Sequence, residues 1–279
     1  MSIDFSQENK VIIDMIDYLT KMCEEFPVDL SKVRQVKSAA PADLFNAGGD
    51  RALDQNGKET FHTFAAKLLF ACKRARPDMQ TLTTVLCTRV RNPTEKDWGN
   101  LIQGMKFVHQ TLQDKLIIRV DDIRIIKWWV DASFAVHPDY KSHTGAVMSF
   151  GRGAPITLSA KQKLNSRSST TAELIGVDDT MNILLWSKLF LEAQGIDVRE
   201  NVLYQDNKSA ILLQENGKAS SGKRTRALNI RYFFVHDQIN KGNLHVVYCP
   251  TDEMRGDYPT KPLQGQVFHE HRAFIMGHD

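Results

Sequence analysis

The first third of the chain shows the spacing of apolar residues that is typical of helices. Between residues 12 and 23 the apolar positions are Ile12, Ile13, Ile16, Leu19 and Met22. This pattern predicts a helix over residues 12–23, followed by a long, partly extended connection over 28–60, where the pattern is lost. Three more helices are predicted after it: one that ends near Pro77, one that Asp78 caps, and one that begins at Thr94.

The pattern changes near residue 116, where Ile, Val and Trp become frequent. Two adjacent strands are predicted within 116–134. The later predicted elements are strands 144–150 and 155–158, helix 169–194, strand 202–205, helices 209–214 and 228–241, strand 244–248 and a closing helix 253–260. A solvated tail is expected at His269–Glu270–His271. This order predicts an α/β domain over 119–279, preceded by a small, mainly helical region over 1–118.

The composition is that of an ordinary globular protein, with 42% hydrophobic and 25% charged residues among 279. A formal net charge of +3 permits an acidic partner such as nucleic acid without requiring one. The isolated cysteines Cys23, Cys72, Cys87 and Cys249 disfavour a zinc knuckle or redox motif and suit a reducing compartment. No secretory signal is visible, and no apolar run reaches the ~18 residues of a membrane span. We therefore expect an intracellular protein of the cytoplasm or nucleus, neither secreted nor membrane-bound.

Four acids in the α/β domain occupy positions that solubility alone explains poorly. Asp131 lies inside an otherwise apolar strand, where a carboxylate is unfavourable unless a cation or hydrogen-bond donors meet it. Glu173 lies in the first turn of the long helix, and Asp206 ends a strand, where α/β sheets usually place ligand sites. Asp257 lies in the final segment. Taken singly, Asp206 is explained by a turn or helix cap and Glu173 by solvation, so only their combination indicates a shared site.

The residues from Trp128 onward resemble the ribonuclease H domain of copia-type LTR retrotransposon Pol polyproteins. The matching segments are WWVDASFA (128–135), SHTGAVMSFG (142–151), SAKQKLNSRSSTTAELIG (159–176), LYQDNKSAILL (203–213), NIRYFFVHDQI (229–239) and YPTKPL (258–263). The serine-rich run that ends in Ala172–Glu173 is the most specific of them. Less sharply, residues 5–118 resemble the thumb and connection region that follows the polymerase palm in the same polyproteins, with 61–90 as the recognisable part.

The resemblance implies a ribonuclease H-like mixed five-stranded sheet flanked by helices. It also implies an endonuclease that hydrolyses the RNA strand of RNA–DNA hybrids. The family's catalytic, metal-binding acids carry over onto Asp131, Glu173, Asp206 and Asp257. Such oxygen ligands suit two Mg²⁺ ions, for which Mn²⁺ can substitute. By resemblance, Asp131 bridges both ions, Glu173 and Asp206 complete one site, and Asp257 completes the other.

The resemblance makes an RNA–DNA hybrid the expected partner. Phosphate contacts from basic and polar side chains would position such a duplex without reading its sequence. The residues expected to bind nucleic acid are Ser133, Lys161, Lys163, Arg167, Asn207, Lys223, Arg224, Arg226 and Arg231. For any one lysine, a solvated basic surface is an equally good explanation. The polymerase portion of the same Pol polyprotein is a second expected partner.

The chain departs from the family in ways that keep an alternative open. The loop 249–256 lacks the histidine that many ribonuclease H enzymes place before the last acid to help product release. Residues 226–229 read Arg-Ala-Leu-Asn where the family commonly has Lys-His-Ile-Asp, which affects hybrid contacts or helix capping. The alternative is a catalytically inactive, transposon-derived remnant that binds nucleic acid or a partner. Polymerase activity is not expected, because Asp121–Asp122 lies ten residues before Asp131 and leaves no room for a palm and thumb.

Overall fold

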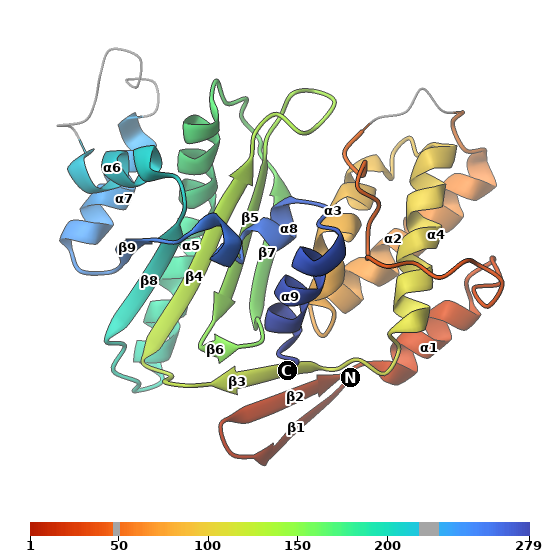
Figure 1. Cartoon of the computed structure of the whole chain (residues 1–279), viewed down its shortest axis with the longest axis horizontal. Coiled ribbons are helices and arrows are strands. Elements are labelled where there is room, and N and C mark those ends of the chain that lie inside the picture. Colours follow the sequence, from red (N-terminus) through yellow and green to blue (C-terminus); the bar gives the residue numbers. More distant parts are fainter. Residues whose placement is uncertain (47–50, 218–228) are drawn as a thin grey trace. The chain divides into compact units, whose positions relative to one another are not determined.

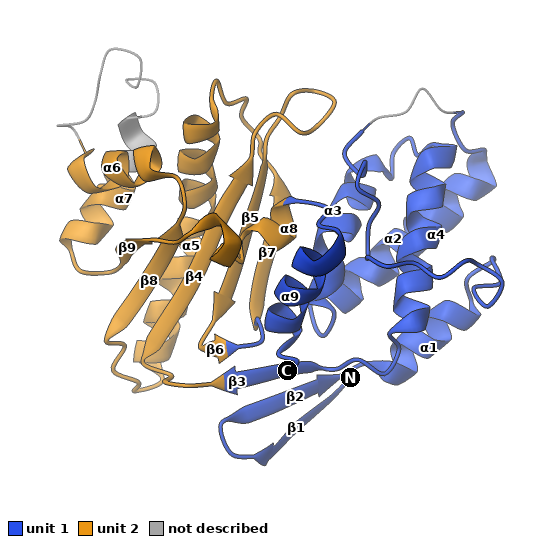
Figure 2. Cartoon of the chain, in the orientation of Figure 1, with its two compact units in different colours: residues 1–119, 152–154, 261–279 blue, residues 120–151, 155–260 orange. Residues whose placement is uncertain are grey.

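A computed structural model describes residues 1–46, 51–217 and 229–279 of the chain (Figure 1). Contacts within the chain divide it into two compact units (Figure 2). Unit 1 comprises residues 1–119, 152–154 and 261–279, and unit 2 comprises residues 120–151 and 155–260. The units change near the boundary expected at residue 118, but the C-terminal residues 261–279 group with the helical region.

Unit 1 combines antiparallel strands with helices. The strands are β1 (Ser2–Gln7), β2 (Lys10–Asp14) and β3 (Leu116–Val120), which pair in that order. The two-residue β6 (Gly151–Arg152) joins the same sheet and lies where the chain passes from unit 2 into unit 1. Its helices are α1 (Ile16–Glu24), α2 (Gln55–Cys72), the 3-10 helix η1 (Pro77–Met79), α3 (Gln80–Arg89), α4 (Glu95–Gln110) and α9 (Gly265–Met276). The predicted start of α4 at Thr94 is confirmed, because the Thr94 and Asp97 side chains accept hydrogen bonds from each other's backbone N–H groups.

Three predictions for unit 1 were wrong. Residues 12–14 are strand, because β2 pairs with both β1 and the distant β3. The loose connection ends early, since Asp54 accepts a hydrogen bond from the Gly57 N–H and caps α2 at Gln55. Asp78 is not the N-cap residue of the next helix, which is Met79 for α3, and its side chain forms a buried ion pair with Arg76.

A fourth prediction was also wrong: residues 269–271, expected to lie in a solvated tail, belong to helix α9. His271 is buried, and the Phe268 ring packs edge-on against Phe107, with centroids 5.7 Å apart. Arg272 Nε donates to Asp78 Oδ2 at 2.9 Å. The helix is therefore part of the core of unit 1. The four polar residues 269–272 interrupt its apolar residues, so their pattern alone did not reveal it.

Unit 2 is built on a mixed sheet with the strand order β7-β5-β4-β8-β9. The strands are β4 (Ile125–Ser133), β5 (His143–Ser149), β7 (Ile156–Lys161), β8 (Glu200–Gln205) and β9 (His245–Tyr248). Strands β4, β5 and β7 pair antiparallel, whereas β8 runs parallel to β4 and β9 runs parallel to β8. Helices flank this sheet, so the predicted fold class of a five-stranded mixed sheet with flanking helices is confirmed.

The long helix α5 (Ser169–Ala193) lies along β4 and β5 (Figure 1). It begins where the Ser168 hydroxyl accepts a hydrogen bond from the Thr171 N–H. Val177, Met181 and Leu184 of α5 share one core with the fully buried Trp128 of β4. The other helices of unit 2 are α6 (Lys208–Asn216), α7 (Asn229–Asn240), the 3-10 helix η4 (Thr251–Glu253) and α8 (Asp257–Thr260). Within the described residues, no helix has the length and apolar character needed to cross a membrane.

Candidate metal centre

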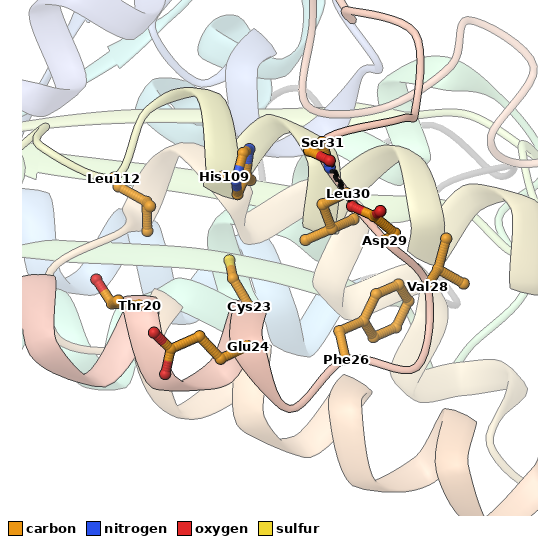
Figure 3. Close-up of a pocket in the computed structure, with 10 residues that line it drawn as sticks. All are labelled: Thr20, Cys23, Glu24, Phe26, Val28, Asp29, Leu30, Ser31, His109 and Leu112. Carbon is orange, nitrogen blue, oxygen red and sulfur yellow. Dashed lines mark hydrogen bonds between the residues drawn. The ribbon is translucent and has the colours of Figure 1, made fainter.

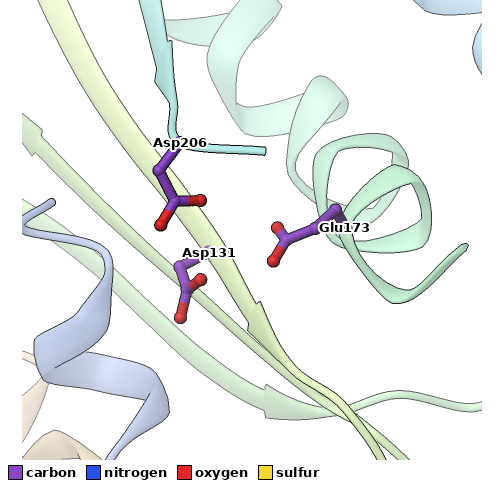
Figure 4. Close-up of side chains that lie close together, drawn as sticks. All are labelled: Asp131, Glu173 and Asp206. Carbon is purple, nitrogen blue, oxygen red and sulfur yellow. The ribbon is translucent and has the colours of Figure 1, made fainter. Parts of the chain in front are cut away.

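Three of the four predicted acids converge in unit 2 (Figure 4). Asp131 lies in the second half of β4, and Asp206 directly follows β8. Because β4 and β8 are parallel neighbours, their carboxyl ends meet at one edge of the sheet. Glu173, in the second turn of α5 and not in the first as expected, extends its carboxylate toward both. One carboxylate oxygen from each acid lies within 4.8 Å of those of the other two.

This acid cluster, Asp131–Glu173–Asp206, concentrates negative charge at a largely buried site with little access to water. The exposed fractions of Asp131 and Glu173 are only 3% and 5%. Burial raises the pKa of Glu173 well above its usual value, and the Asp131 and Asp206 carboxylates raise it further. A hydrogen bond of 3.4 Å from the Gln205 amide offsets this only in part. A divalent cation fits the cluster, because it would bind hard oxygen ligands and remove their mutual repulsion.

The fourth predicted acid, Asp257, is buried at the start of α8 but is not one of the three acids within 4.8 Å of each other. The segment that carries it nevertheless packs directly against β4. A Cβ atom on Gly256 would lie 2.9 Å from the Asp131 backbone N and 3.0 Å from the Asp131 Cβ. Only glycine permits this close approach, so Gly256 sets the distance between α8 and the acid cluster.

Thr260, at the end of α8, is a member of the site that sequence reasoning missed. Its Oγ1 lies 2.5 Å from Asp131 Oδ2 and 3.1 Å from the carbonyl oxygens of Gly256 and Asp257. A hydroxyl has one proton, and the charged carboxylate is the strongest of these acceptors. Thr260 therefore donates to Asp131 and fixes one of its two oxygens. The only signal in the sequence was the position of Thr260 inside the YPTKPL segment.

Comparison with known sequences finds retrotransposon relatives. The chain is 27% identical over 263 residues, 93% of its length, to the retrovirus-related Pol polyprotein from transposon TNT 1-94 of Nicotiana tabacum. It is 30% identical over 195 residues, 69% of its length, to the corresponding protein from transposon RE1 of Arabidopsis thaliana. The chain is homologous to the retrovirus-related Pol polyproteins of copia-type transposons. The expected resemblance is thereby confirmed.

This Pol-related chain spans only part of its relatives: 20% of the length of the tobacco protein and 13% of that of the Arabidopsis protein. No protein-family model matches it. Among solved structures, LC11-RNase H1, isolated from compost by a metagenomic approach, is similar with a TM-score of 0.37 and 15% sequence identity. That similarity covers 49% of this chain and 92% of the solved one.

The residues predicted to bind nucleic acid differ in their exposure and in their ion-pair and hydrogen-bond partners. Lys163 and Arg167 are exposed on the connection that leads into α5. The Lys161 ammonium forms an ion pair of 2.7 Å with Asp139. The buried Ser133 hydroxyl donates to the Thr260 carbonyl at 3.2 Å. Asn207 caps α6 by accepting from the Ala210 N–H, and Lys223, Arg224, Arg226 and the Arg231 side chain lie outside the described residues.

Unit 1 of the Pol-related chain contains a cavity of about 330 Å³ (Figure 3). Cys23, Glu24 and His109 line it, a set of residue types that can support nucleophilic chemistry. Burial, however, raises the pKa of the Cys23 thiol to about 11, so the thiol stays protonated at neutral pH. Asp29, also at the cavity, accepts a hydrogen bond of 2.5 Å from the Ser31 hydroxyl, and a 3.1 Å ion pair links it to Lys32. The acid cluster of unit 2 is therefore the better candidate for chemistry.

Proposed function

We propose that unit 2 is a metal-dependent endonuclease that hydrolyses the RNA strand of RNA–DNA hybrids. The observation that carries this proposal is the convergence of the Asp131, Glu173 and Asp206 carboxylates within 4.8 Å at the carboxyl edge of the sheet. Homology to Pol polyproteins supports it, because these acids occupy the motifs on which the ribonuclease H resemblance rests. The mixed sheet supplies the scaffold on which both aspartates reach one edge.

The proposed cofactor is Mg²⁺, with two ions bound and Mn²⁺ as a substitute. Asp131 would contact both ions, Glu173 and Asp206 would complete one site, and Asp257 the other. When bound, such ions lower the pKa of a water molecule and stabilise the leaving 3′-oxygen of the scissile phosphate. Hydrolysis would leave a 5′-phosphate and a 3′-hydroxyl.

The chain's own residues orient the carboxylates and the substrate. Thr260 donates to Asp131 Oδ2 and so orients that carboxylate. The Gln205 amide donates to Glu173 Oε2, while its Oε1 accepts from the backbone N–H of Asp206. One glutamine side chain therefore orients two segments of the acid cluster. Lys163 and Arg167, exposed ahead of Glu173, would bind phosphates of the hybrid and hold the duplex over the cluster.

Cleavage of a labelled RNA–DNA hybrid tests the proposal directly. We expect wild-type protein to cut only the RNA strand in Mg²⁺ or Mn²⁺, and Asp131→Asn to abolish cutting. Asp237→Asn is the matched control, because Asp237 is an exposed aspartate that pairs with Lys241 at the end of α7. The absence of cutting by folded wild-type protein in both metals would overturn the proposal.

One observation favours a second candidate, a non-catalytic remnant that binds nucleic acid or the polymerase portion of a Pol polyprotein. Asp257 is not among the acids that lie within 4.8 Å of one another, so the acid proposed as a ligand of the second ion stands outside the acid cluster in this arrangement. A remnant of this kind would bind the hybrid without cutting it. Binding measured beside the cleavage assay therefore separates the two candidates.

A further inference from the structure

An exposed aromatic side chain lies beside the acid cluster and takes no part in it. Tyr248 ends β9, the edge strand of the sheet, and is 47% exposed. It pairs in register with Gln205, the residue that orients Glu173 and directly precedes Asp206. Strands in a sheet are about 4.8 Å apart, so Tyr248 lies within one or two nucleotide lengths of the cluster.

A cation accompanies this ring. Lys208, in the first turn of α6, places its ammonium 4.8 Å from the centroid of the Tyr248 ring. Lys208 is exposed and stands two residues after Asp206. Among the residues that the structure describes, no acid forms an ion pair with Lys208, whereas the predicted Lys161 is neutralised by Asp139. Lys208 is therefore better placed than Lys161 to bind a phosphate.

The chain that follows Tyr248 also contacts the cluster. The Thr251 hydroxyl donates to Asp206 Oδ2 at 3.3 Å, and the Cys249 N–H donates to the Gln205 carbonyl at 2.9 Å. The end of β9 and the following turn are thus fixed relative to Asp206. A ligand held by Tyr248 would consequently be held at a defined position relative to the carboxylates.

We propose that Tyr248 and Lys208 form a subsite for one nucleotide of the strand that is presented to the acid cluster. The tyrosine ring packs against a sugar of the hybrid, whose bases are paired and stacked, and the Lys208 ammonium binds the adjoining phosphate. Aromatic and cationic side chains are combined in a similar way where proteins bind nucleic acid without sequence preference. This subsite rests on the proposed nuclease function and adds to it the residues that position the strand.

Hybrid binding in the absence of divalent metal tests the subsite separately from catalysis. We measure the Kd of a labelled RNA–DNA hybrid for the full chain by fluorescence anisotropy at several salt concentrations. Tyr248→Ala should raise Kd by about 5- to 100-fold, and Tyr248→Phe, which keeps the ring, should bind as the wild type does. Lys208→Ala should reduce the slope of log Kd against log salt by about one.

The matched controls are Trp186→Ala and Lys241→Ala. Trp186 is an exposed aromatic residue far along α5 from Glu173. Lys241 lies just before the opposite end of β9 and pairs with Asp237. Neither change should alter Kd. In the cleavage assay, Tyr248→Ala should raise KM and leave kcat unchanged, a split that a merely structural role would not produce.

The outcomes separate the subsite from the nuclease. Cutting by the wild type with unchanged Kd for Tyr248→Ala and Lys208→Ala would overturn the subsite and leave the nuclease standing. Binding that depends on Tyr248 without any cutting would overturn the nuclease and support the subsite. If the wild type does not bind the hybrid, or if the controls weaken binding equally, the subsite is overturned.

Discussion

The Thr260 hydroxyl lies 2.5 Å from Oδ2 of Asp131, although the two residues are 129 positions apart in the sequence. The contact links α8 to β4, and the Ser133 hydroxyl reinforces it by donating to the Thr260 carbonyl. A ligand carboxylate that is held by a hydrogen-bond donor keeps its orientation and loses less freedom when it binds a cation. Thr260 thereby makes Asp131 a preorganised ligand.

Thr260→Val removes this donor while it keeps the shape of the side chain. We expect about a 10- to 100-fold loss in apparent Mg²⁺ affinity or in activity, the usual effect of removing a partner of a metal ligand. Thr260→Ser should restore most of the loss. A titration of cleavage rate against Mg²⁺ concentration measures the effect, and wild-type behaviour of Thr260→Val would show that Thr260 does not orient Asp131.

Glu173→Gln should stabilise the metal-free protein at neutral pH. Burial and the neighbouring carboxylates raise the pKa of Glu173 in the folded state above its unfolded value. The folded state therefore binds the proton of the Glu173 carboxyl more tightly than the unfolded state does. The stability that this proton contributes is complete below about pH 4.3, the ordinary pKa of Glu, and is lost as the pH rises above it. The glutamine variant lacks this loss, so its metal-free Tm should fall less than that of the wild type as the pH rises above about 4.3.

The same variant should also lose its response to Mg²⁺. A ligand that binds only the folded state stabilises it by about 2.7 kcal/mol at a hundred times its Kd. We expect Mg²⁺ to raise the wild-type Tm and to have much less effect on Glu173→Gln. Glu192→Gln is the control on the same helix, because Glu192 pairs with Lys188 at the far end of α5. An equal Mg²⁺ response in all three proteins would contradict a metal site at the acid cluster.

The buried ion pair in unit 1 gives a prediction that is independent of catalysis. The Asp78 and Arg76 side chains are fully buried, and Asp78 also binds Arg272. Burial alone would raise the pKa of Asp78, but Arg76 and Arg272 overcome this and lower it to about 2. Asp78→Asn removes the negative charge that both guanidinium groups face, although Thr111 and Asp114 still accept hydrogen bonds from them. We expect a loss of about 3–5 kcal/mol in the free energy of unfolding.

Urea unfolding at neutral pH measures this loss. Asp43→Asn is the control, because Asp43 is exposed where it pairs with Lys96 and its loss should change stability little. The contribution of Asp78 should be complete above its unfolded pKa, about 3.9, and should disappear as pH falls toward 2. A similar effect of both substitutions would mean that the buried pair does not stabilise unit 1.

Sequence reasoning located the three converging acids because each lay at a recognisable place in a local pattern. Asp131 interrupted an apolar strand, Asp206 ended one, and Glu173 began a long amphipathic helix. These signals depend on neighbouring residues only. The convergence itself follows from the parallel pairing of β4 with β8, which the structure shows and the sequence did not specify beyond a mixed five-stranded sheet.

The errors have the opposite cause, since they depend on partners far away in the sequence. Ile12 and Ile13 fit a helical spacing, but their strand β2 is fixed by pairing with β3 more than a hundred residues later. Thr260 and Tyr248 show no local pattern, and their roles follow from contacts that only the tertiary structure brings together. Short apolar runs and single polar residues therefore remained ambiguous until the fold was known.

Gly256 provides the last prediction, because it controls how closely α8 approaches β4. An alanine Cβ at this position would meet the backbone N and the Cβ of Asp131 at 2.9 and 3.0 Å, and backbone cannot move aside as a flexible side chain can. Gly256→Ala should push α8 away, break the contact between Thr260 and Asp131, and destabilise the protein by about 1–3 kcal/mol. The rate of hybrid cleavage by this variant should also fall.

Gly99→Ala is the matched control for Gly256→Ala. A Cβ atom on Gly99 meets nothing within 4 Å, and Gly99 lies inside α4. Alanine is favoured over glycine in a helix by up to about 1 kcal/mol, so this variant should be as stable as the wild type or more stable. Thermal unfolding and hybrid cleavage of both variants decide the point. If Gly256→Ala keeps full stability and activity, the close packing of α8 on Asp131 is not needed to hold the acid cluster.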